Sequence, residues 1–185
     1  MKHYIKALIA FITLITGYQS YAQQTFSAPL FRKAFLEDIN QIRKKGCNCG
    51  VKYMPPAPPL VWNYQLELAA IGHARDMASH NYFSHTSLDG RDLGDRVRAI
   101  GYTFKGFKKY AIGENIAQGQ ESIAEVMAGW LKSEGHCRNL MNPEFKEVGV
   151  AVDNTYWVQD FGLREPFSPE VQKLIESGKY KIMEK

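Results

Sequence analysis

Apolar residues recur at helical spacing in the first third of the chain. In residues 31–45 they stand every three or four positions, at Phe31, Phe35, Ile39 and Ile42, and Gly46 follows where the helix should end. The proline-rich residues 54–59 then predict a stiff, extended spacer. A second stripe follows the capping residue Asn63, so we expect helices over 31–45 and about 63–81.

Two shorter helical stripes follow. A turn at residues 89–90 precedes apolar positions up to Ile100, and Gly101 should stop this short helix. Residues 102–112 are aromatic and basic and are interpreted as a loop. Ser122 is placed to cap a helix that continues to about Leu131.

In the last part of the chain, the spacing of apolar residues changes from that of a helix to that of a strand. Residues 148–152 and 155–161 alternate or run apolar, and Asp153 and Asn154 between them predict a β-hairpin. Ser168 can start one short C-terminal helix that Gly178 ends. Helices followed by a hairpin indicate an α+β fold, with helices packed on an antiparallel sheet.

The N-terminus has the pattern of an export signal. Lys2 and Lys6 precede an apolar stretch of about ten residues, and residues 20–22 (Ser-Tyr-Ala) form a small-x-small cleavage site. The stretch is shorter than the roughly 20 residues that span a bilayer. We therefore expect cleavage after Ala22, no transmembrane segment afterwards, and a secreted or periplasmic product.

Charge gives little support for nucleic-acid binding. The whole chain has a formal charge of +4, with 23 basic and 19 acidic residues. Without Lys2 and Lys6 of the predicted signal, 21 basic residues remain and the charge is +2. Basic residues occur only in short runs, so nucleic acid is not expected as a partner.

Three cysteines remain after the predicted signal, and export would allow a disulfide. Cys47 and Cys49 are too close in sequence to pair without strain, so a bridge from either one to Cys137 is favoured. It would close a loop of roughly 90 residues, worth on the order of 4 kcal/mol. The alternative is zinc bound by the three thiolates and His136.

Three polar residues stand in distinctive strings: His85 in FSHTS, Glu114 in GENI and His136 in SEGHC. Two imidazoles and a carboxylate can hold a metal with open positions or act as acid and base. Their separations of 29 and 22 residues match no local metal motif, so only the fold can bring them together. A different trio, His73, Asp76 and His80, falls on one helix face and is interpreted as solvated surface rather than a metal site.

Several strings occur together in a characteristic order. They are WN at 62, ARDMA at 74, FSHT at 83, RV at 96 with GY at 101, GENIA at 113, WLKSEGH at 130, NLM at 139, VGV at 148 and WVQDFG at 157. In this the chain resembles bacterial members of the CAP superfamily (SCP/PR-1, cysteine-rich secretory proteins). The resemblance covers about residues 31–163, after the signal (1–22) and a leader (23–30). Residues 164–185 form a C-terminal extension.

The resemblance implies a three-layer α-β-α sandwich with a central antiparallel sheet. It also implies a cavity with two histidines and two acidic residues, of which His85, Glu114 and His136 match three. Ser133 stands where the animal and plant branch has the second acid, and Glu134 is one residue further on. A shift of one residue turns a helical side chain by about 100°.

Several functions compete for this cluster. In the first, His85 and His136 bind Zn²⁺ or another divalent metal, with Glu114 as a ligand or outer partner. In the second, the cluster serves a peptide or ester hydrolase. Its nucleophile would be one of three serines, Ser84, Ser87 or Ser133. In the third, the cluster is a structural hydrogen-bond network in an interaction module. Metal or ligand binding ranks first, and catalysis stays open.

Other residues have structural interpretations. Asn115 and Asn139 are expected to fix loops, and Trp62, Trp130 and Trp157 to anchor the core. The aromatic residues 102–110 could instead form the entry rim for an apolar ligand, as in lipid- or sterol-binding relatives. The expected partner is therefore a small molecule, a lipid or a peptide.

Overall fold

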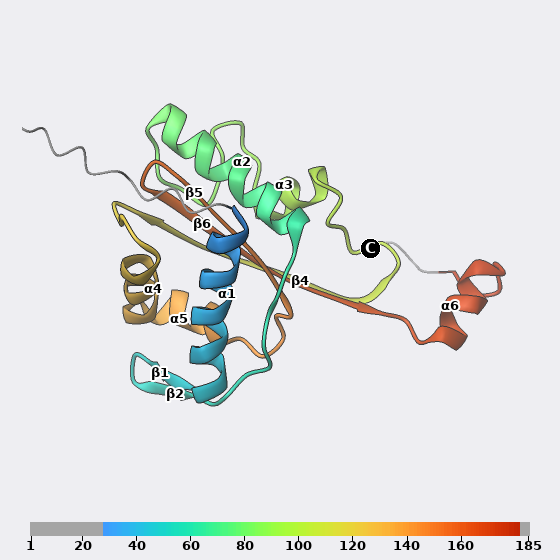
Figure 1. Cartoon of the computed structure of the whole chain (residues 1–185). Helices are drawn as coiled ribbons and strands as arrows, with labels where there is room; N and C mark the ends of the chain where they lie inside the picture. The colour runs from blue at the N-terminus through green and yellow to red at the C-terminus, as the bar shows by residue number, and fades with distance from the viewer. Residues whose placement is uncertain (1–27, 182–185) are drawn as a thin grey trace, which may run out of the picture.

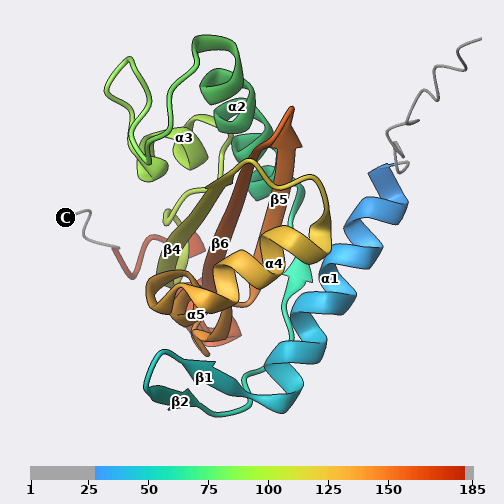
Figure 2. The same cartoon turned by 90° about the vertical axis from the view of Figure 1, so that its left-hand side faces the viewer.

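The chain folds into three layers, with a sheet between two sets of helices (Figure 1, Figure 2). The computed structural model describes residues 28–181, so the predicted signal lies outside the described residues. Helices α2 and α3 cover one face of the main sheet, and α1, α4 and α5 lie on the other. The elements are α1 (Ala28–Lys45), β1 (Cys47–Cys49), β2 (Lys52–Met54), β3 (Val61–Trp62), α2 (Tyr64–His80), α3 (Leu93–Ala99), β4 (Phe107–Gln118), α4 (Ile123–Lys132), α5 (Glu134–Met141), β5 (Glu147–Asp153), β6 (Tyr156–Pro166) and α6 (Pro169–Glu176). The predicted α-β-α sandwich is confirmed.

The main sheet has the strand order β3-β5-β6-β4. The pairs β4–β6 and β5–β6 are antiparallel, as expected, and the two-residue β3 adds a parallel pair with β5. Asn154 takes positive φ in the tight turn between β5 and β6, which confirms the predicted hairpin. Residues 156–163 of the central strand β6 are all buried.

Helix α1 begins at Ala28, three residues before the predicted start and inside the predicted leader. Pro29 does not prevent this, because proline is tolerated in the first turn of a helix. Phe35 and Ile39 on its inner face are fully buried. The helix ends as predicted before Gly46, whose φ of 72° suits glycine.

Helix α2 has the predicted boundaries. The Asn63 side chain accepts hydrogen bonds from the backbone N–H groups of Gln65 and Leu66, and Asn81 ends the helix in the left-handed region. The helix lies very close to β5. A Cβ atom at Gly149 would stand 2.0 Å from the backbone nitrogen of Glu67, so only glycine permits this approach.

The larger core lies between the sheet and helices α1 and α4. Trp130 and Trp157 are almost fully buried there, and Trp62 packs at the edge of the same cluster. Phe35 contacts both of the buried tryptophan rings. The predicted role of the three tryptophans as core anchors is therefore confirmed.

One prediction about local structure is wrong, and one helix was not predicted. Residues 102–112 are not all loop, because β4 begins at Phe107 and pairs with the end of β6. That pairing also carries β6 to Pro166. In addition, α5 was not predicted, although its buried residues Cys137, Leu140 and Met141 stand at helical spacing.

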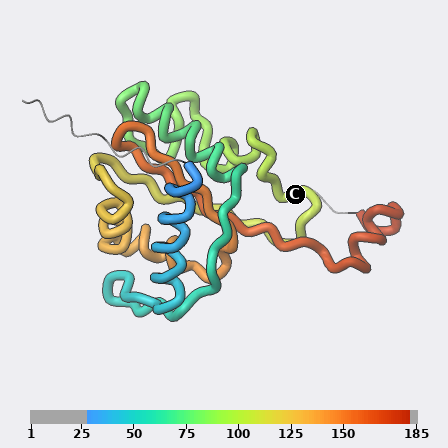
Figure 3. Tube along the Cα trace, viewed as in Figure 1, coloured from blue at the N-terminus to red at the C-terminus, as the bar shows by residue number. Residues whose placement is uncertain are grey.

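Two peripheral parts complete the chain. The hairpin β1–β2 lies beyond the end of α1, and residues 55–60 form the predicted connector without regular structure. The predicted C-terminal helix is present as α6, which stands away from the sandwich at the end of β6 (Figure 3). It has no buried residue. Within residues 28–181, no helix has both the length and the apolar character needed to cross a membrane.

Candidate functional site

His85 and Glu114 meet at one side of the sheet. His85 lies in the segment between α2 and α3, Glu114 lies on β4, and the His85 Nδ1 to Glu114 Oε1 distance is 2.7 Å. The His85 side chain is 57% exposed, whereas that of Glu114 is 3% exposed. Because a carboxylate only accepts, Nδ1 carries the proton, and in the neutral ring Nε2 keeps its lone pair.

Arg96 on α3 holds the other oxygen of the same carboxylate. Its Nη2 donates to Glu114 Oε2 at 2.6 Å, and its Nη1 donates to the His85 carbonyl at 2.8 Å. Burial raises the pKa of Glu114, but the hydrogen bond from His85 and the charge of Arg96 outweigh it and leave the pKa below its ordinary value. Glu114 is therefore an ionised carboxylate with both oxygens engaged.

A second carboxyl group, Asp160, lies behind Glu114. It is directly opposite Glu114 in the β4–β6 register and is fully buried. Neither of its oxygens meets a hydrogen-bond donor in the described part of the chain. Burial, followed by the negative charge of Glu114, raises the pKa of Asp160 well above its ordinary value. A protonated Asp160 can donate its O–H to the Glu114 carboxylate.

His136 approaches the site from α5. Burial and the nearby His85 lower the pKa of His136, so its ring is neutral at pH 7. Among residues 28–181, however, His85, Glu114 and His136 do not form a set whose ligand atoms all lie within 4.8 Å of one another. The structure brings His85 and Glu114 into contact and leaves His136 as an electrostatic neighbour of His85.

Two asparagines fix α5 against β4. Asn115 Nδ2 donates to the His136 carbonyl at 3.2 Å and to Gln159 at 2.9 Å. Asn139 Nδ2 donates to the Glu114 carbonyl at 3.1 Å and to Asn115 Oδ1 at 2.9 Å. Both side chains satisfy backbone carbonyls, but these carbonyls belong to helix α5 and strand β4 rather than to the predicted loops, and the bonds set the position of His136 relative to Glu114.

A cavity opens beside the His85–Glu114 pair. Its volume is about 550 Å³, and it is open to solvent. The lining residues are His85, Thr86, Asp92, Leu93, Gly94, Arg98, Ile112 and Glu114. Charges of both signs at its wall favour a polar occupant over a purely apolar one.

The aromatic residues 102–110 do not surround this cavity as a rim. Tyr102 is fully buried and donates its O–H to Glu147 at 2.6 Å, and Phe107 and Tyr110 belong to β4. Phe104 is the large side chain that stays exposed, at 44%. None of the residues 102–110, Phe104 included, is among those that line the cavity.

Neither candidate for the fourth cavity residue is among the residues that line the cavity beside His85. Ser133 occupies the junction between α4 and α5 and makes no side-chain cap hydrogen bond. Glu134 is half exposed and pairs with Arg138 one turn along α5. The second acidic group beside Glu114 is Asp160 instead.

The trio on α2 is not one solvated face, which corrects the interpretation from the sequence. His73 is buried, and its Nε2 contacts the Ser84 carbonyl at 2.9 Å. His80 and Asp76 form an exposed pair at 3.0 Å. The helical spacing was correctly identified, but the short segment after α2 folds back over His73.

No serine stands ready as a nucleophile at the candidate site. Within the described residues, no hydrogen bond joins a serine hydroxyl to the ring of His85 or His136. The serine hydroxyl that does contact a histidine ring in residues 28–181 is that of Ser87, which lies 3.4 Å from His73 Nδ1, and both side chains are buried. Ser84 caps the backbone of Thr86. No observation favours hydrolysis over binding.

The cysteines pair as one of the two predicted alternatives. Cys49 and Cys137, which are 88 positions apart in the sequence, form the disulfide, and Cys47 keeps a free thiol. The three sulfur atoms lie within 4.8 Å of one another, but His136 is not part of that group. The predicted bridge to Cys137 is confirmed, with Cys49 as the partner.

Sequence reasoning gave no role to Arg96 or Asp160. Arg96 stands in the RV string and Asp160 in the WVQDFG string, so both were visible as parts of motifs. Asp160 could have been recognised from the sequence, because it is the one acidic residue inside the apolar run 156–163. A carboxyl group in such a run is buried and needs a partner. The identity of that partner depends on strand register.

The fold and the polar cluster define a class of protein, and comparison with known families agrees. The family model described as "CAP: Cysteine-rich secretory protein family" matches residues 36–161 of the chain. The chain belongs to this family.

Relatives from Bacillus subtilis extend the comparison. The chain is 34% identical over 143 residues to the uncharacterized protein YkwD, covering 74% of this chain and 50% of that protein. It is 37% identical over 102 residues to the uncharacterized membrane protein YlbC, covering 55% of this chain and 28% of that protein. The chain thus spans half or less of the length of these two relatives.

Two solved structures have the same fold. An extracellular protein from Bacillus anthracis that contains an SCP domain superposes with a TM-score of 0.57 at 31% identity, over 72% of this chain and 41% of that chain. An outer surface protein from Borrelia burgdorferi gives a TM-score of 0.61 at 23% identity, over 76% of this chain and 97% of that chain. The second comparison concerns the fold alone.

Proposed function

We propose that the chain is an exported CAP domain that binds a divalent metal of the zinc class through His85 and His136, with Glu114 as the orienting carboxylate. The observation that carries this proposal is the hydrogen bond from His85 Nδ1 to Glu114. Metal-binding histidines commonly donate their second ring N–H to a carboxylate, which fixes the tautomer and the ring orientation. His85 has this arrangement before any ligand arrives.

The remaining donors fit such a role. The lowered pKa of His136 keeps its imidazole neutral, which a metal ligand requires. Glu114 gives one oxygen to His85 and the other to Arg96, so it fits the outer partner better than a direct ligand. A bound zinc ion would supply Lewis acidity and open positions for a water or a polar ligand.

The cavity supports a small polar ligand near this position. Arg98 and Asp92 line it together with His85, so an occupant that carries both hydrogen-bond donors and acceptors would find partners. The protein's residues would orient such a molecule rather than transform it. Lipid binding is supported here only by the exposed Phe104.

Export is supported from several sides. The first 22 residues have the composition of a signal peptide, and a structural disulfide favours an oxidising compartment. The similar protein from Bacillus anthracis is named as extracellular, and the one from Borrelia burgdorferi as an outer surface protein. We propose the same side of the membrane for this chain.

Calorimetric zinc titration of untagged residues 23–185 tests the metal site. The Cys47→Ser background removes the free thiol as a competing ligand. We expect one site in this background, with affinity reduced at least about tenfold by His85→Ala or His136→Ala and about tenfold by Glu114→Gln. His80→Ala is the matched control, because His80 is an exposed histidine outside the cavity. Equal losses in all four variants, or no binding in the background, would refute the proposal.

A further inference from the structure

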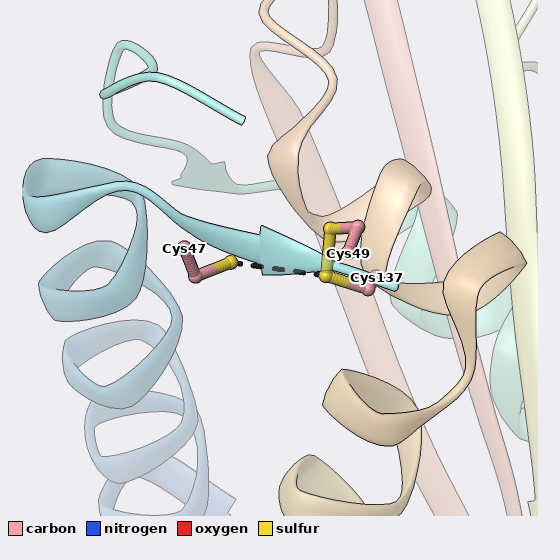
Figure 4. Close-up of side chains that lie close together, drawn as sticks. All are labelled: Cys47, Cys49 and Cys137. Carbon is pink, nitrogen blue, oxygen red and sulfur yellow. Dashed lines mark hydrogen bonds between the residues drawn. A yellow bond between two sulfur atoms is a disulfide. The ribbon is translucent and has the colours of Figure 1, made fainter. Parts of the chain in front are cut away.

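The three cysteines form a compact cluster at the edge of the molecule. Cys47 and Cys49 lie at positions i and i+2 of β1, and alternate residues of a strand point to the same face. That face meets Cys137 on α5, so both strand cysteines reach the same sulfur (Figure 4). Cys49 is bonded to Cys137, and the free Cys47 Sγ lies 3.7 Å from Cys137 Sγ.

The three cysteines differ in their exposure to solvent. Cys49 and Cys137 are completely buried, and they pack with Met141 and Ala57. Cys47 is only half-buried. An external thiol can therefore approach Cys47 but not the existing disulfide.

We propose that this cluster is a thiol–disulfide exchange site in which Cys47 is the internal nucleophile. The Cys47 thiolate attacks Cys137 Sγ, the Cys47–Cys137 bond forms, and the Cys49–Cys137 bond breaks. The electron pair leaves with Cys49 as a thiolate, which takes up the proton that Cys47 gave to solvent. Nothing is oxidised or reduced overall, so the step needs no cofactor.

The geometry permits this step after one rotation. All three sulfur atoms lie within 4.8 Å of one another, so Cys47 Sγ sits beside the disulfide rather than in line with it. In-line attack therefore requires the Cys47 side chain to change its rotamer, and side chains that are not fully buried change rotamer rapidly. Burial raises the pKa of the Cys47 thiol, so exchange should accelerate as the pH rises towards that pKa.

The consequence is a route by which an external thiol reaches a buried bond. In the Cys47–Cys137 form, one sulfur of the disulfide belongs to the half-buried residue. A low-molecular-weight thiol can attack that sulfur, form a mixed disulfide at Cys47 and release Cys137 as a thiolate. The substrate class of the site is therefore a small thiol, and this property is independent of the proposed metal site.

Reduction kinetics test the proposal directly. The wild type, Cys47→Ser and the control Asn48→Ser are exposed to glutathione at pH 8, quenched in acid, alkylated and weighed by mass spectrometry. Cys47→Ser keeps the native disulfide, so we expect it to fold and to lose that bond about tenfold more slowly than the wild type. Asn48 is an exposed residue between the two cysteines, and its variant should match the wild type. Equal rates in all three proteins would overturn the proposal.

Two further measurements address the same step. Wild-type protein whose Cys47 has been alkylated in the native state should resist glutathione as Cys47→Ser does, without any change of sequence. Cys49→Ser should form a Cys47–Cys137 bond in a glutathione redox buffer, seen as a loss of two protons. If Cys49→Ser is folded by circular dichroism and keeps two free thiols there, the exchange site is refuted. Native protein that holds zinc on three reduced cysteines would also refute it.

Discussion

Glu114 and Asp160 face each other across the β4–β6 ladder, and both carboxyl groups are buried. Two adjacent acids cannot both ionise cheaply in such a place. Arg96 and His85 favour the charge on Glu114, so Asp160 keeps the proton. One buried strand pair thus holds a carboxylate that faces the cavity and a neutral acid that supports it from behind.

Asp160→Asn should remove a pH-dependent loss of stability. The folded-state pKa of Asp160 is raised, so the unfolded chain releases this proton first as the pH rises above about 4. The wild type should therefore lose stability relative to the variant from about pH 4 upwards, by at most about 1.4 kcal/mol per pH unit. Urea unfolding between pH 4 and 8 measures this. The exposed Asp38→Asn is the control, and a pH-independent difference for Asp160→Asn would contradict the assignment.

Arg96→Met should destabilise the domain by about 3–5 kcal/mol, because it removes the charged partner of the buried Glu114 carboxylate, to which His85 still donates a hydrogen bond. Glu114→Gln removes that charge and should restore part of the loss when the two changes are combined. A double-mutant cycle by urea unfolding gives the coupling energy. Additive losses would show that the Arg96–Glu114 contact does not stabilise the fold.

Gly149→Ala should cost about 3 kcal/mol or more, because its Cβ would overlap the backbone of α2 at Leu66 and Glu67. Backbone atoms cannot step aside as a side chain can. Gly129→Ala is the matched control: Gly129 lies within α4 with no atom near the new Cβ, and alanine there should add about 0.5–1 kcal/mol. Thermal unfolding of both variants decides whether the spacing between α2 and β5 is fixed at Gly149.

Arg43→Lys should lower the unfolding free energy by about 3 kcal/mol. Arg43 is fully buried, burial lowers its pKa to about 10, and it remains charged at neutral pH. A lysine ammonium cannot reproduce the planar fork of the guanidinium. That fork donates to the carbonyls of Pro58, Leu140, Asn142 and Phe145.

The control for that change is Arg138→Lys, since Arg138 is half exposed and pairs with Glu134 on the surface of α5. We expect its effect to stay within about 0.5 kcal/mol. Chemical denaturation measures the unfolding free energy of both variants. A much larger loss in Arg43→Lys would show that the buried hydrogen bonds of Arg43, rather than its charge alone, stabilise the fold. Similar small losses in both would contradict the role given to Arg43.

The helix caps and the tight turn of the hairpin could be predicted from the sequence. Asn63, Ser122 and Ser168 cap the helices they were expected to cap, because capping depends on a side chain and the next three backbone groups. The Asp153–Asn154 turn is equally local. In contrast, β4 (residues 107–118) was missed, because these residues become a strand only through the distant pairing with β6.

The candidate site was predictable in part for a similar reason. The family resemblance associated His85 with Glu114, and the structure places them in contact. Asp160 and Arg96 were missed because burial and strand register decide their roles. Local sequence patterns do not reveal burial or register. The choice of Cys49 over Cys47 is also tertiary, since both residues point to the same face of β1.

The amide hydrogen-exchange rate of strand β6 measures how often the whole domain unfolds. The strand is bonded to β4 along one edge and to β5 along the other, and residues 156–163 are buried. Its amide hydrogens can meet deuterium only when the whole domain opens, whereas α6, which has no buried residue, is exposed to solvent throughout. The deuteration rate of this one strand therefore reports the global opening free energy, and α6 supplies the fast reference within the same chain.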